Sequence, residues 1–589
     1  MKSLKNTITN SLPIILFSMC LMVFYYSFYD IDFSRGDNIL FHNGTIITME
    51  KQHQYPEAVY IENGIIKSIG NFDHIKKKIL SSTIIVDLNG RTLMPGFIDS
   101  HTHPVISSFL YDMIDLSGFT HYSKEKVWEH LTNEVSNYNP NDWILCKGFD
   151  QVLVPGLTPP SISYLDSIAP NNPLLIASQS LHSYWANSLA FQASGIKSST
   201  PDPSKSSYYE RDSLGKFTGY IAEQTAFEPF KNTILKSIGI NKLKNNSLMV
   251  MRDYVKNGYT SITSMGITTS DKKVIQLYKH ISSKRSNMLN NILSILGILP
   301  NREHTVRNFV FVRHDAPHLL PESVLNGDDF FKIMGIKFWY DGSPYTGSMY
   351  LEEPYIDNNF TNNILLIPQE HKGKALLTKD QIQKNIKKYQ SENWQLAIHT
   401  QGDIAIREVL NAFESAQSKI NYRHRLEHCL LINSTSIERM ANINVYPSFH
   451  INHLYYYGNV LNNKLIGKQR ANRMLPLKSA VENSLKFTIH ADQPMFPSEP
   501  FSLLSTAVNR KTKEGQVIGG QHAITIYQAL KALTIDAAWQ IKMDEKIGSI
   551  KEGKYGDLII LDRNPLEVLK TELRDIKVLD IYVHGNQIN

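Results

Sequence analysis

The central part of the chain alternates short apolar runs with amphipathic segments. Residues 403–416, DIAIREVLNAFESA, repeat apolar positions at helical spacing, whereas residues 395–399, QLAIH, form a compact run typical of a buried strand. Seven or eight such strand–helix units indicate an α/β protein with a (β/α)₈ TIM barrel that carries insertions. The runs that we expect to form barrel strands are residues 94–99, 259–265, 333–340, 395–399, 423–428, 444–449 and 485–489.

Both ends of the chain show a different, strand-rich pattern. Asn-Gly pairs at Asn43, Asn63 and Asn89 fall among β-branched runs, which predicts hairpins, and YGDLIILD near the C-terminus has the same character. Because the N-terminal hairpins alone would make a thin sheet, we expect both ends to pair in one composite β-sandwich. The predicted organisation is a sandwich from residues 37–94 and 548–589, a barrel over 95–547, and an inserted subdomain at about 105–250 that covers the barrel mouth.

The N-terminal segment is uncharged from residue 12 to residue 29, with two lysines before it and two aspartates after it. This length is near the minimum for a membrane-spanning helix, and the charge asymmetry favours a cytoplasmic N-terminus. We therefore expect residues 1–36 to be an uncleaved membrane anchor, with the catalytic domain periplasmic or otherwise extracytoplasmic. The alternative is a cleaved signal peptide and a secreted protein, but no small-x-small cleavage site follows the apolar core.

Charge and cysteine content exclude two other classes of protein. The net charge is +6 over 589 residues and is scattered along the chain, so no nucleic-acid partner is expected. The three cysteines, Cys20, Cys146 and Cys429, lack metal-finger spacing and an even count, which favours free thiols over a disulfide framework.

Several predicted barrel strands end in side chains that can bind a metal ion. His101 and His103 lie two residues apart and therefore on one side of a strand, while His399, His428 and Asp492 end three other strands. Barrel enzymes build their sites at the C-terminal ends of the strands, so these side chains are expected to converge. Each has a simpler explanation as a cap or a core residue, but five at equivalent positions favour a divalent ion such as zinc, iron, manganese or nickel.

Lys337 lies inside a predicted core strand, where an unpaired ammonium is costly. A salt bridge to Asp341 or a neighbouring carboxylate is one explanation. The other is a deprotonated lysine that captures carbon dioxide as a carbamate and so becomes an anionic ligand. Arg425 and Glu427 share a strand face opposite His428, and we interpret both as structural groups behind the site.

Motifs along nearly the whole chain after the anchor resemble the amidohydrolase superfamily, specifically its amidohydrolase-3 branch of YtcJ-like metal-dependent hydrolases. They include TLMPGFIDSHTHP, LHSYWANSLAF, GKFTGYIAEQ, GIKFWYDGSPYTGSM, AIHTQGDIAIREVLNAFE, HRLEHC, HADQPM and GSIKEGKYGDLIILDRNPL. The resemblance implies a (β/α)₈ barrel beside a composite β-sandwich and two divalent ions, with zinc expected. It places the metal ligands on His101, His103, the carboxylated Lys337, His399, His428 and Asp492, with Asp492 as the catalytic aspartate. His490 departs from the pattern, because many relatives read Gly-Ser-Asp where this chain reads His-Ala-Asp.

The expected function is hydrolysis of a small molecule at a non-peptide amide, formamide or N-acyl bond, by a metal-bridging hydroxide with Asp492 as general base and then general acid. A mononuclear deaminase or esterase-like hydrolase on the same fold is the first alternative, and a non-catalytic membrane-anchored binding protein is the second. A second copy of the chain is a candidate partner. Residues that we expect near the substrate are His182, Tyr184, Trp185 and Glu223 in the inserted segment, and His450 and His453 after a barrel strand.

Overall fold

The computed structural model describes residues 37–50, 55–205, 207–267, 271–282, 306–416 and 420–588. The anchor predicted for residues 1–36 lies outside the described residues. Within the described part of the chain, no helix has both the length and the apolar character needed to cross a membrane.

Eight parallel strands form the central sheet of the described chain, in sequence order around the barrel. They are β7 (Phe97–Thr102), β14 (Tyr259–Met265), β15 (Arg307–Arg313), β16 (Phe331–Trp339), β17 (Gln395–Thr400), β18 (His424–His428), β19 (Val445–His450) and β20 (Thr488–His490). The last strand also contacts the first, so the sheet closes almost completely. The α/β fold and the parallel barrel sheet predicted from the sequence are thereby confirmed.

Two strand predictions need correction. The run at residues 94–99 is divided at Gly96, because residues 92–95 form β6 (Thr92–Pro95) of another sheet and β7 begins only at Phe97. A side chain at Gly96 would collide with Thr260, since a Cβ there would lie 2.2 Å from Thr260 Cγ2. The third barrel strand, β15, was not among the predicted runs.

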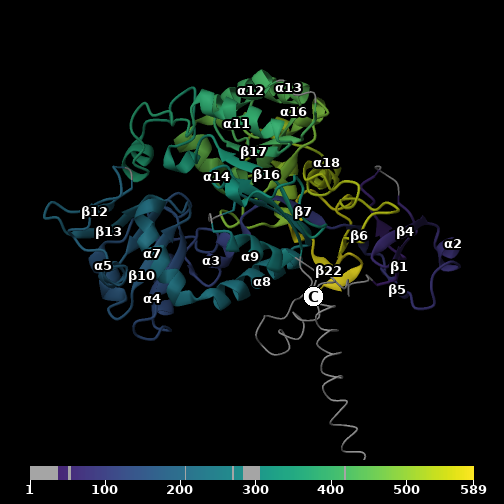
Figure 1. Cartoon of the computed structure of the whole chain (residues 1–589), viewed down its shortest axis with the longest axis horizontal. Helices are drawn as coiled ribbons and strands as arrows, with labels where there is room; N and C mark the ends of the chain where they lie inside the picture. Colours follow the sequence, from purple (N-terminus) through teal and green to yellow (C-terminus); the bar gives the residue numbers. More distant parts are fainter. Residues whose placement is uncertain are drawn as a thin grey trace, which may run out of the picture.

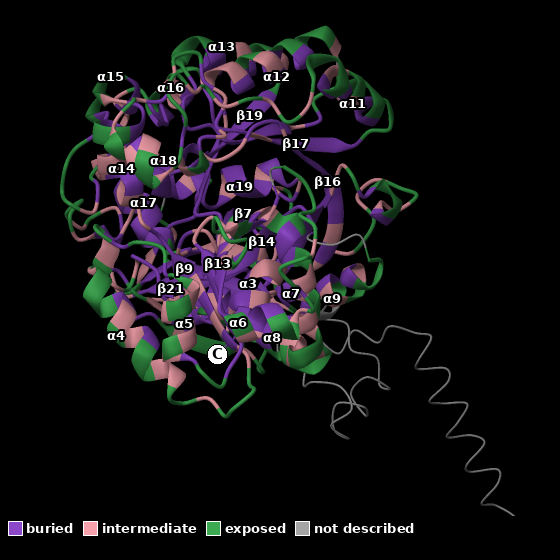
Figure 2. Ribbon diagram, turned by 90° about the vertical axis from the view of Figure 1, so that its left-hand side faces the viewer, coloured by how far each residue is buried: buried purple, intermediate pink, exposed green. Residues whose placement is uncertain are grey.

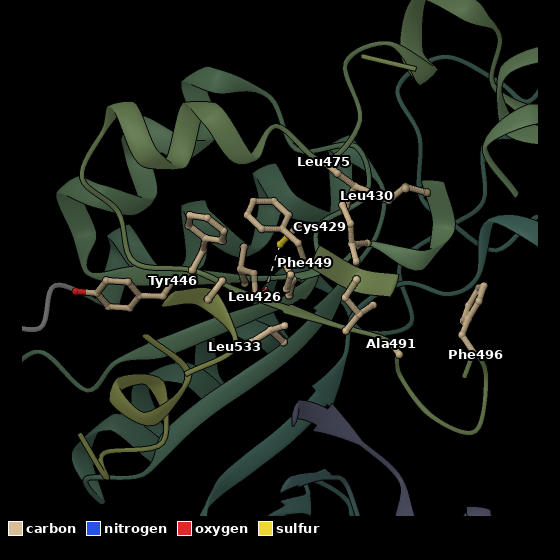
Figure 3. Close-up of a cluster of buried hydrophobic side chains, with 14 of the residues drawn as sticks. Leu426, Cys429, Leu430, Tyr446, Phe449, Leu475, Ala491, Phe496 and Leu533 are labelled. Atoms are coloured by element: carbon tan, nitrogen blue, oxygen red, sulfur yellow. Dashed lines mark hydrogen bonds between the residues drawn. The ribbon is translucent and has the colours of Figure 1, made fainter. Parts of the chain in front are cut away.

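Helices cover the outer face of the barrel, among them α9 (Lys273–Ser282), α11 (Lys379–Ser391), α12 (Asp403–Ala416), α13 (Ser434–Ile443), α16 (Leu477–Glu482), α17 (Pro500–Asn509) and α18 (Ile526–Ala532). In α12 the buried side chains Ile406, Val409, Leu410 and Phe413 recur at helical spacing. In Figure 2 the barrel strands are coloured as buried, whereas the surrounding helices carry exposed residues on their outer faces. The outward side chains of β18 and β19, such as Leu426, form the apolar layer beneath these helices (Figure 3).

A second unit combines strands from both ends of the chain. One sheet contains β4 (Ile65–Gly70), β3 (Ala58–Glu62), β1 (Ile39–His42) and β5 (Ile84–Asp87); the other contains β2 (Thr45–Ile46), β6, β21 (Leu558–Leu561), β22 (Val578–Val583) and β23 (Asn586–Ile588). β21 pairs antiparallel with β6, which joins the C-terminal strands to the N-terminal ones. Phe41 of the first sheet and Leu558 of the second belong to one apolar cluster.

The three Asn-Gly pairs do not all make hairpins. Asn63 connects β3 to its antiparallel neighbour β4, and both central residues have positive φ, as a type I′ turn requires. Asn43 and Asn89 instead connect strands of the two different sheets, β1 to β2 and β5 to β6. Their corners run side by side, with Thr45 N donating to Arg91 O at 3.0 Å. The hairpin prediction is therefore correct at Asn63 and wrong at Asn43 and Asn89.

The inserted segment between β7 and β14 forms a subdomain of its own beside the barrel (Figure 1). Its sheet contains β12 (Tyr209–Arg211), β13 (Phe217–Ala222), β11 (Ser183–Ala186), β10 (Leu174–Ser178), β9 (Ile144–Phe149) and β8 (Ile114–Asp115). Its helices are α3 (Pro104–Leu110), α4 (Lys124–Val135), α5 (Ile162–Ile168), α6 (Ser188–Ala193) and α7 (Glu223–Ile238). The next helix, α8 (Ile240–Lys256), packs against barrel strand β14. Gln179 Nε2 donates to Met495 O at 2.6 Å, which connects the subdomain to the loop after β20.

Candidate metal centre

Histidines gather where the barrel strands end. His101 lies near the end of β7, and His428, His450 and His490 are the last residues of β18, β19 and β20. All four are buried. Their rings form a continuous cluster, in which the His101 ring stacks on that of His490 with centroids 4.5 Å apart. The convergence expected from parallel strand ends is therefore present.

Asp492 lies between two groups of these histidines. Its Oδ1 is 3.3 Å from His101 Nε2 and 3.0 Å from His103 Nε2. Its Oδ2 is 4.0 Å from the Nδ1 atoms of both His428 and His450. One carboxylate therefore faces two sets of imidazole nitrogens through its two different oxygens.

Unusual backbone conformation brings two of these groups into place. Strand alternation would direct His428 outward, because Glu427 faces the cluster. The chain turns into the left-handed region at His428, where φ is 71°, and Asp492 has a φ of 61°. Left-handed backbone at non-glycine residues is costly and is concentrated at functional sites.

Glu427 and Arg425 form a fully buried support for His101. His101 Nδ1 lies 2.6 Å from Glu427 Oε2, and Arg425 donates to both oxygens of Glu427, from Nε at 2.7 Å and from Nη2 at 2.9 Å. Because Nδ1 is used in this contact, Nε2 is left to face Asp492. A carboxylate that is hydrogen-bonded to the far nitrogen of a metal-binding histidine fixes the orientation of its ring. This agrees with the interpretation of Glu427 and Arg425 as structural groups behind the site.

Burial keeps the imidazoles of His101, His399 and His428 neutral, whereas contacts with histidines keep the Asp492 carboxylate ionised. Burial lowers the pKa of His399 to about 3, and it holds the pKa of His101 and His428 well below the ordinary value. Burial acts to raise the pKa of Asp492, but hydrogen bonding and charge at His103, together with neighbouring histidines, outweigh it and lower the pKa. Neutral imidazole and ionised carboxylate are the protonation states that bind metal ions.

The residues fit a divalent ion. Among the described residues, three groups of side chains each have ligand atoms within 4.8 Å of one another: His101, His103 and Asp492; His428, His450 and His490; and His101, Glu427 and His490. His399 Nε2 and His428 Nδ1 are buried without a hydrogen-bond partner in the described chain. Buried polar atoms are normally satisfied, so such a concentration indicates a ligand that binds there. The nitrogen and oxygen donors suit zinc and other first-row ions.

Lys337 extends from β16 toward the same region and is fully buried. Its Nζ has no hydrogen-bond partner within the described residues, and burial lowers its pKa to about 8. A salt bridge to Asp341 does not form, because that carboxylate instead accepts backbone N–H groups of Gln401, Gly402 and Tyr350. Among the described residues, no carboxylate therefore forms an ion pair with this buried lysine.

Of the other predicted site residues, His399 lies beside the histidine cluster, whereas His182 and Glu223 lie in the inserted subdomain. The ring of His399 lies 4.3 Å from that of His428, and its Nε2 is 3.7 Å from Asp341 Oδ1. His182 and Glu223 form a half-exposed pair, 2.8 Å apart, at the turn that follows Gln179.

Trp185 and Tyr184 pack in the apolar cores of the inserted subdomain, and neither is among the residues that gather around Asp492. His450, predicted to touch substrate, is buried inside the histidine cluster. His453 lies beside it, with ring centroids 4.0 Å apart.

Sequence reasoning missed an aromatic wall beside the cluster. Phe496 packs against His450 with centroids 4.6 Å apart, and it meets Phe119 of the inserted subdomain at 5.8 Å. Tyr345 stacks on Tyr457 at 4.1 Å and reaches His453 Nδ1 with its hydroxyl at 2.6 Å. All lie in loops or helices that follow strand ends, which is the signal that points to them.

The amidohydrolase family model matches residues 85–588, which is most of the chain. The chain belongs to the amidohydrolase family. It is a hydrolase that acts on carbon–nitrogen bonds other than peptide bonds.

Two curated relatives are similar over nearly their whole length. N-substituted formamide deformylase of Arthrobacter pascens is 26% identical over 93% of this chain and 97% of that relative. The putative amidohydrolase YtcJ of Bacillus subtilis is also 26% identical, over 93% of this chain and 98% of that relative.

A crystal structure of an uncharacterized metal-dependent hydrolase from Pyrococcus horikoshii superposes with a TM-score of 0.70 at 22% identity, over 91% of this chain and 99% of the other. This likeness establishes the shared fold.

Proposed function

We propose that this amidohydrolase is metal-dependent and cleaves the carbon–nitrogen bond of a small formamide, N-acyl amine or related non-peptide amide. The observation that carries the proposal is the position of Asp492, whose two oxygens face separate sets of histidines at the ends of the barrel strands. The name of the deformylase relative supports the formamide as the first substrate to test.

His101, His103 and Asp492 would hold one ion, because they form a compact group of nitrogen and oxygen donors. The family resemblance assigns a second ion to His399, His428 and a carboxylated Lys337, and the buried Nζ of Lys337 without a partner supports such a modification. Divalent ions at these residues would activate water and polarise the substrate carbonyl.

The chain's own residues perform the proton transfers and the positioning. Asp492 would accept a proton at a carboxylate oxygen from the attacking water, and it would return the proton to the departing nitrogen. Glu427 holds His101 in one tautomer and orientation, and Arg425 fixes Glu427 in turn. Phe496 and Phe119 form an apolar wall between the barrel and the inserted subdomain that can exclude bulk water from a bound substrate.

The test is turnover of a panel of N-formyl and N-acyl amines, with metal content measured on the same samples. We expect release of an amine together with formate or a carboxylate, loss of activity with a chelator, and its return when metal is added. Release of free ammonia from an amino-substituted ring would indicate the deaminase alternative instead. Full activity in chelated, metal-free protein would contradict the proposal.

A further inference from the structure

One edge of the six-stranded sheet in the inserted subdomain carries a histidine and a glutamate that the proposed chemistry does not use. β11 pairs antiparallel with β13, with Ser183 opposite Ala222. His182 directly precedes β11 and Glu223 directly follows β13, so both residues extend past the same edge of the sheet. His182 Nδ1 lies 2.8 Å from Glu223 Oε2, and the two side chains are 48% and 46% exposed.

The same edge of this sheet contacts the mouth of the barrel. β9 runs parallel to β10, and β10 runs antiparallel to β11, so β9 and β10 both end at this edge. Asp150, which follows β9, accepts a hydrogen bond from the Tyr457 hydroxyl of α14 (Asn452–Val460). Gln179, which follows β10, donates to the loop that carries Asp492. Because β10, β11 and β13 are consecutive neighbours in the sheet, the pair lies about 5–10 Å along the edge from Gln179.

The stability of the fold does not explain this pair. The backbone is left-handed at Leu181, where φ is 58°, and at Glu223, where φ is 66°. A left-handed non-glycine residue costs more free energy than a half-exposed ion pair returns. The Glu223 backbone N–H donates to His182 O at 2.9 Å, which holds the two strained segments together. Strain that is maintained in this way is typical of functional sites.

With its imidazole neutral, the pair offers hydrogen-bond acceptors and one net negative charge. A carboxylate only accepts hydrogen bonds, so the imidazole donates Nδ1–H to Glu223 Oε2 and keeps Nε2 as an acceptor. Glu223 Oε1 is the second acceptor of the pair. Among the described residues, no lysine or arginine forms an ion pair with Glu223. A cation with several N–H donors, such as a primary ammonium, therefore fits the pair better than a carboxylate or an apolar group.

We propose that His182 and Glu223 bind a primary ammonium at the far end of the substrate. The amide that is cleaved at the metal centre then belongs to a diamine acylated at one nitrogen. This inference rests on the proposed function and narrows its substrate class. The pair lies away from the scissile bond, so it strengthens binding of the substrate and of the transition state alike. Its contribution should consequently appear in KM rather than in kcat.

The first experiment compares N-formyl diamines with N-formyl amino alcohols of equal length over a series of spacer lengths. The assay runs at about pH 8, above the ordinary titration range of imidazole. We expect the ammonium-ended compounds to have the lower KM, with the largest preference at one spacer length. Glu223→Gln should reduce that preference about 10-fold, because it removes the charge that pairs with the ammonium.

Glu228→Gln is the matched control. Glu228 also lies in α7, is 50% exposed and forms an ion pair with Lys231. Its replacement removes the same charge from the inserted subdomain and should leave the ammonium preference as in the wild type. His182→Gln should reduce the preference less than Glu223→Gln, because the carboxylate remains. Circular dichroism shows whether each variant is folded, and His182→Gln carries the test if Glu223→Gln is not.

A binding measurement separates this site from the proposed function. The metal-loaded full chain is titrated calorimetrically with methanesulfonamides of the same diamines, which resist hydrolysis. The wild type should bind the best of them about 10-fold more tightly than Glu223→Gln does, and added salt should shrink the difference. Binding that depends on Glu223 in a protein that hydrolyses no amide would count against the proposed function alone. Equal discrimination by the wild type and Glu223→Gln, an equal loss in Glu228→Gln, or a preference for carboxylate-ended N-formyl amino acids would overturn the ammonium site.

Discussion

Replacing Glu427 with glutamine removes the charge at the centre of the Arg425–Glu427–His101 network while keeping the shape of the side chain. Arg425 and Glu427 are both fully buried, and the guanidinium donates to both carboxylate oxygens. The variant therefore leaves a buried arginine without its counter-charge and changes the group that orients His101.

Glu427→Gln should have two separate effects, one on the free energy of unfolding and one on metal affinity. Removing one partner of a buried ion pair costs about 3–5 kcal/mol of unfolding free energy, and the amide oxygen that remains places glutamine near the lower end. Loss of a carboxylate behind a metal-binding histidine weakens metal affinity roughly 10–100-fold. The first effect concerns folding, and the second concerns the orientation of His101 Nε2.

Two other ion pairs of the chain separate these effects. Arg307 and Asp557 form an equally buried pair, with Arg307 Nε donating to Asp557 Oδ2 at 2.6 Å, but they join the barrel to the sandwich. Asp557→Asn should therefore lower stability by a similar amount and leave metal affinity unchanged. Glu414→Gln breaks a partly exposed pair with Arg439, and it should cost only about 0–1 kcal/mol.

The assay combines denaturant unfolding of metal-free protein with a Zn²⁺ competition titration of each variant. The orientation argument predicts that only Glu427→Gln loses metal affinity. It would be refuted if Glu427→Gln and Asp557→Asn bound zinc equally well, whatever their stabilities.

Three further predictions concern other parts of the molecule. Asp492→Asn should lower kcat by about 10²–10⁴-fold in metal-loaded enzyme, and unchanged turnover would exclude it as the base. Burial raises the pKa of Asp150 from 3.8 to about 6, so the folded state loses stability as pH rises through that range. Denaturant titrations should show that the unfolding free energy of Asp150→Asn rises by about 1 kcal/mol relative to that of the wild type between about pH 5 and 7. A difference in unfolding free energy that does not change with pH would contradict this. Gly64→Ala should lower the free energy of unfolding by more than about 1 kcal/mol, because φ is +80° and a Cβ would lie 2.4 Å from His584 O. Gly90 has a similar φ of +78°, but a Cβ there would meet no atom within 4 Å. If Gly90→Ala lowered the free energy of unfolding as much as Gly64→Ala, the contact with His584 would not contribute to the loss.

The barrel and the position of its site were predictable because both follow from short-range patterns. Buried strands alternate with helices, and the side chains that end parallel strands must meet at one end of the barrel. His101 and Asp492 are far apart in sequence, yet they lie 3.3 Å apart for this reason. β15 escaped prediction because it begins and ends with arginine and contributes none of the donors around Asp492.

Contacts set by tertiary packing could not be predicted in the same way. Strand alternation places Glu427 and His428 on opposite faces, and only the left-handed backbone at His428 brings both toward the cluster. The motif that contains Trp185 does not reveal that this ring packs against Phe149 inside the inserted subdomain. The pairing of His450 with His490 depends on the register of β19 and β20, which periodicity alone does not determine.

The junction between β6 and β21 has a consequence for synthesis of the protein. β6 is made early, but the strand that pairs with its free edge is translated near the end, after the whole barrel. During elongation on the ribosome, β6 therefore presents unpaired backbone groups of the kind that promote aggregation. Nascent chains that stall before β21 should consequently be substrates for chaperones or proteases, however well their catalytic barrel has formed.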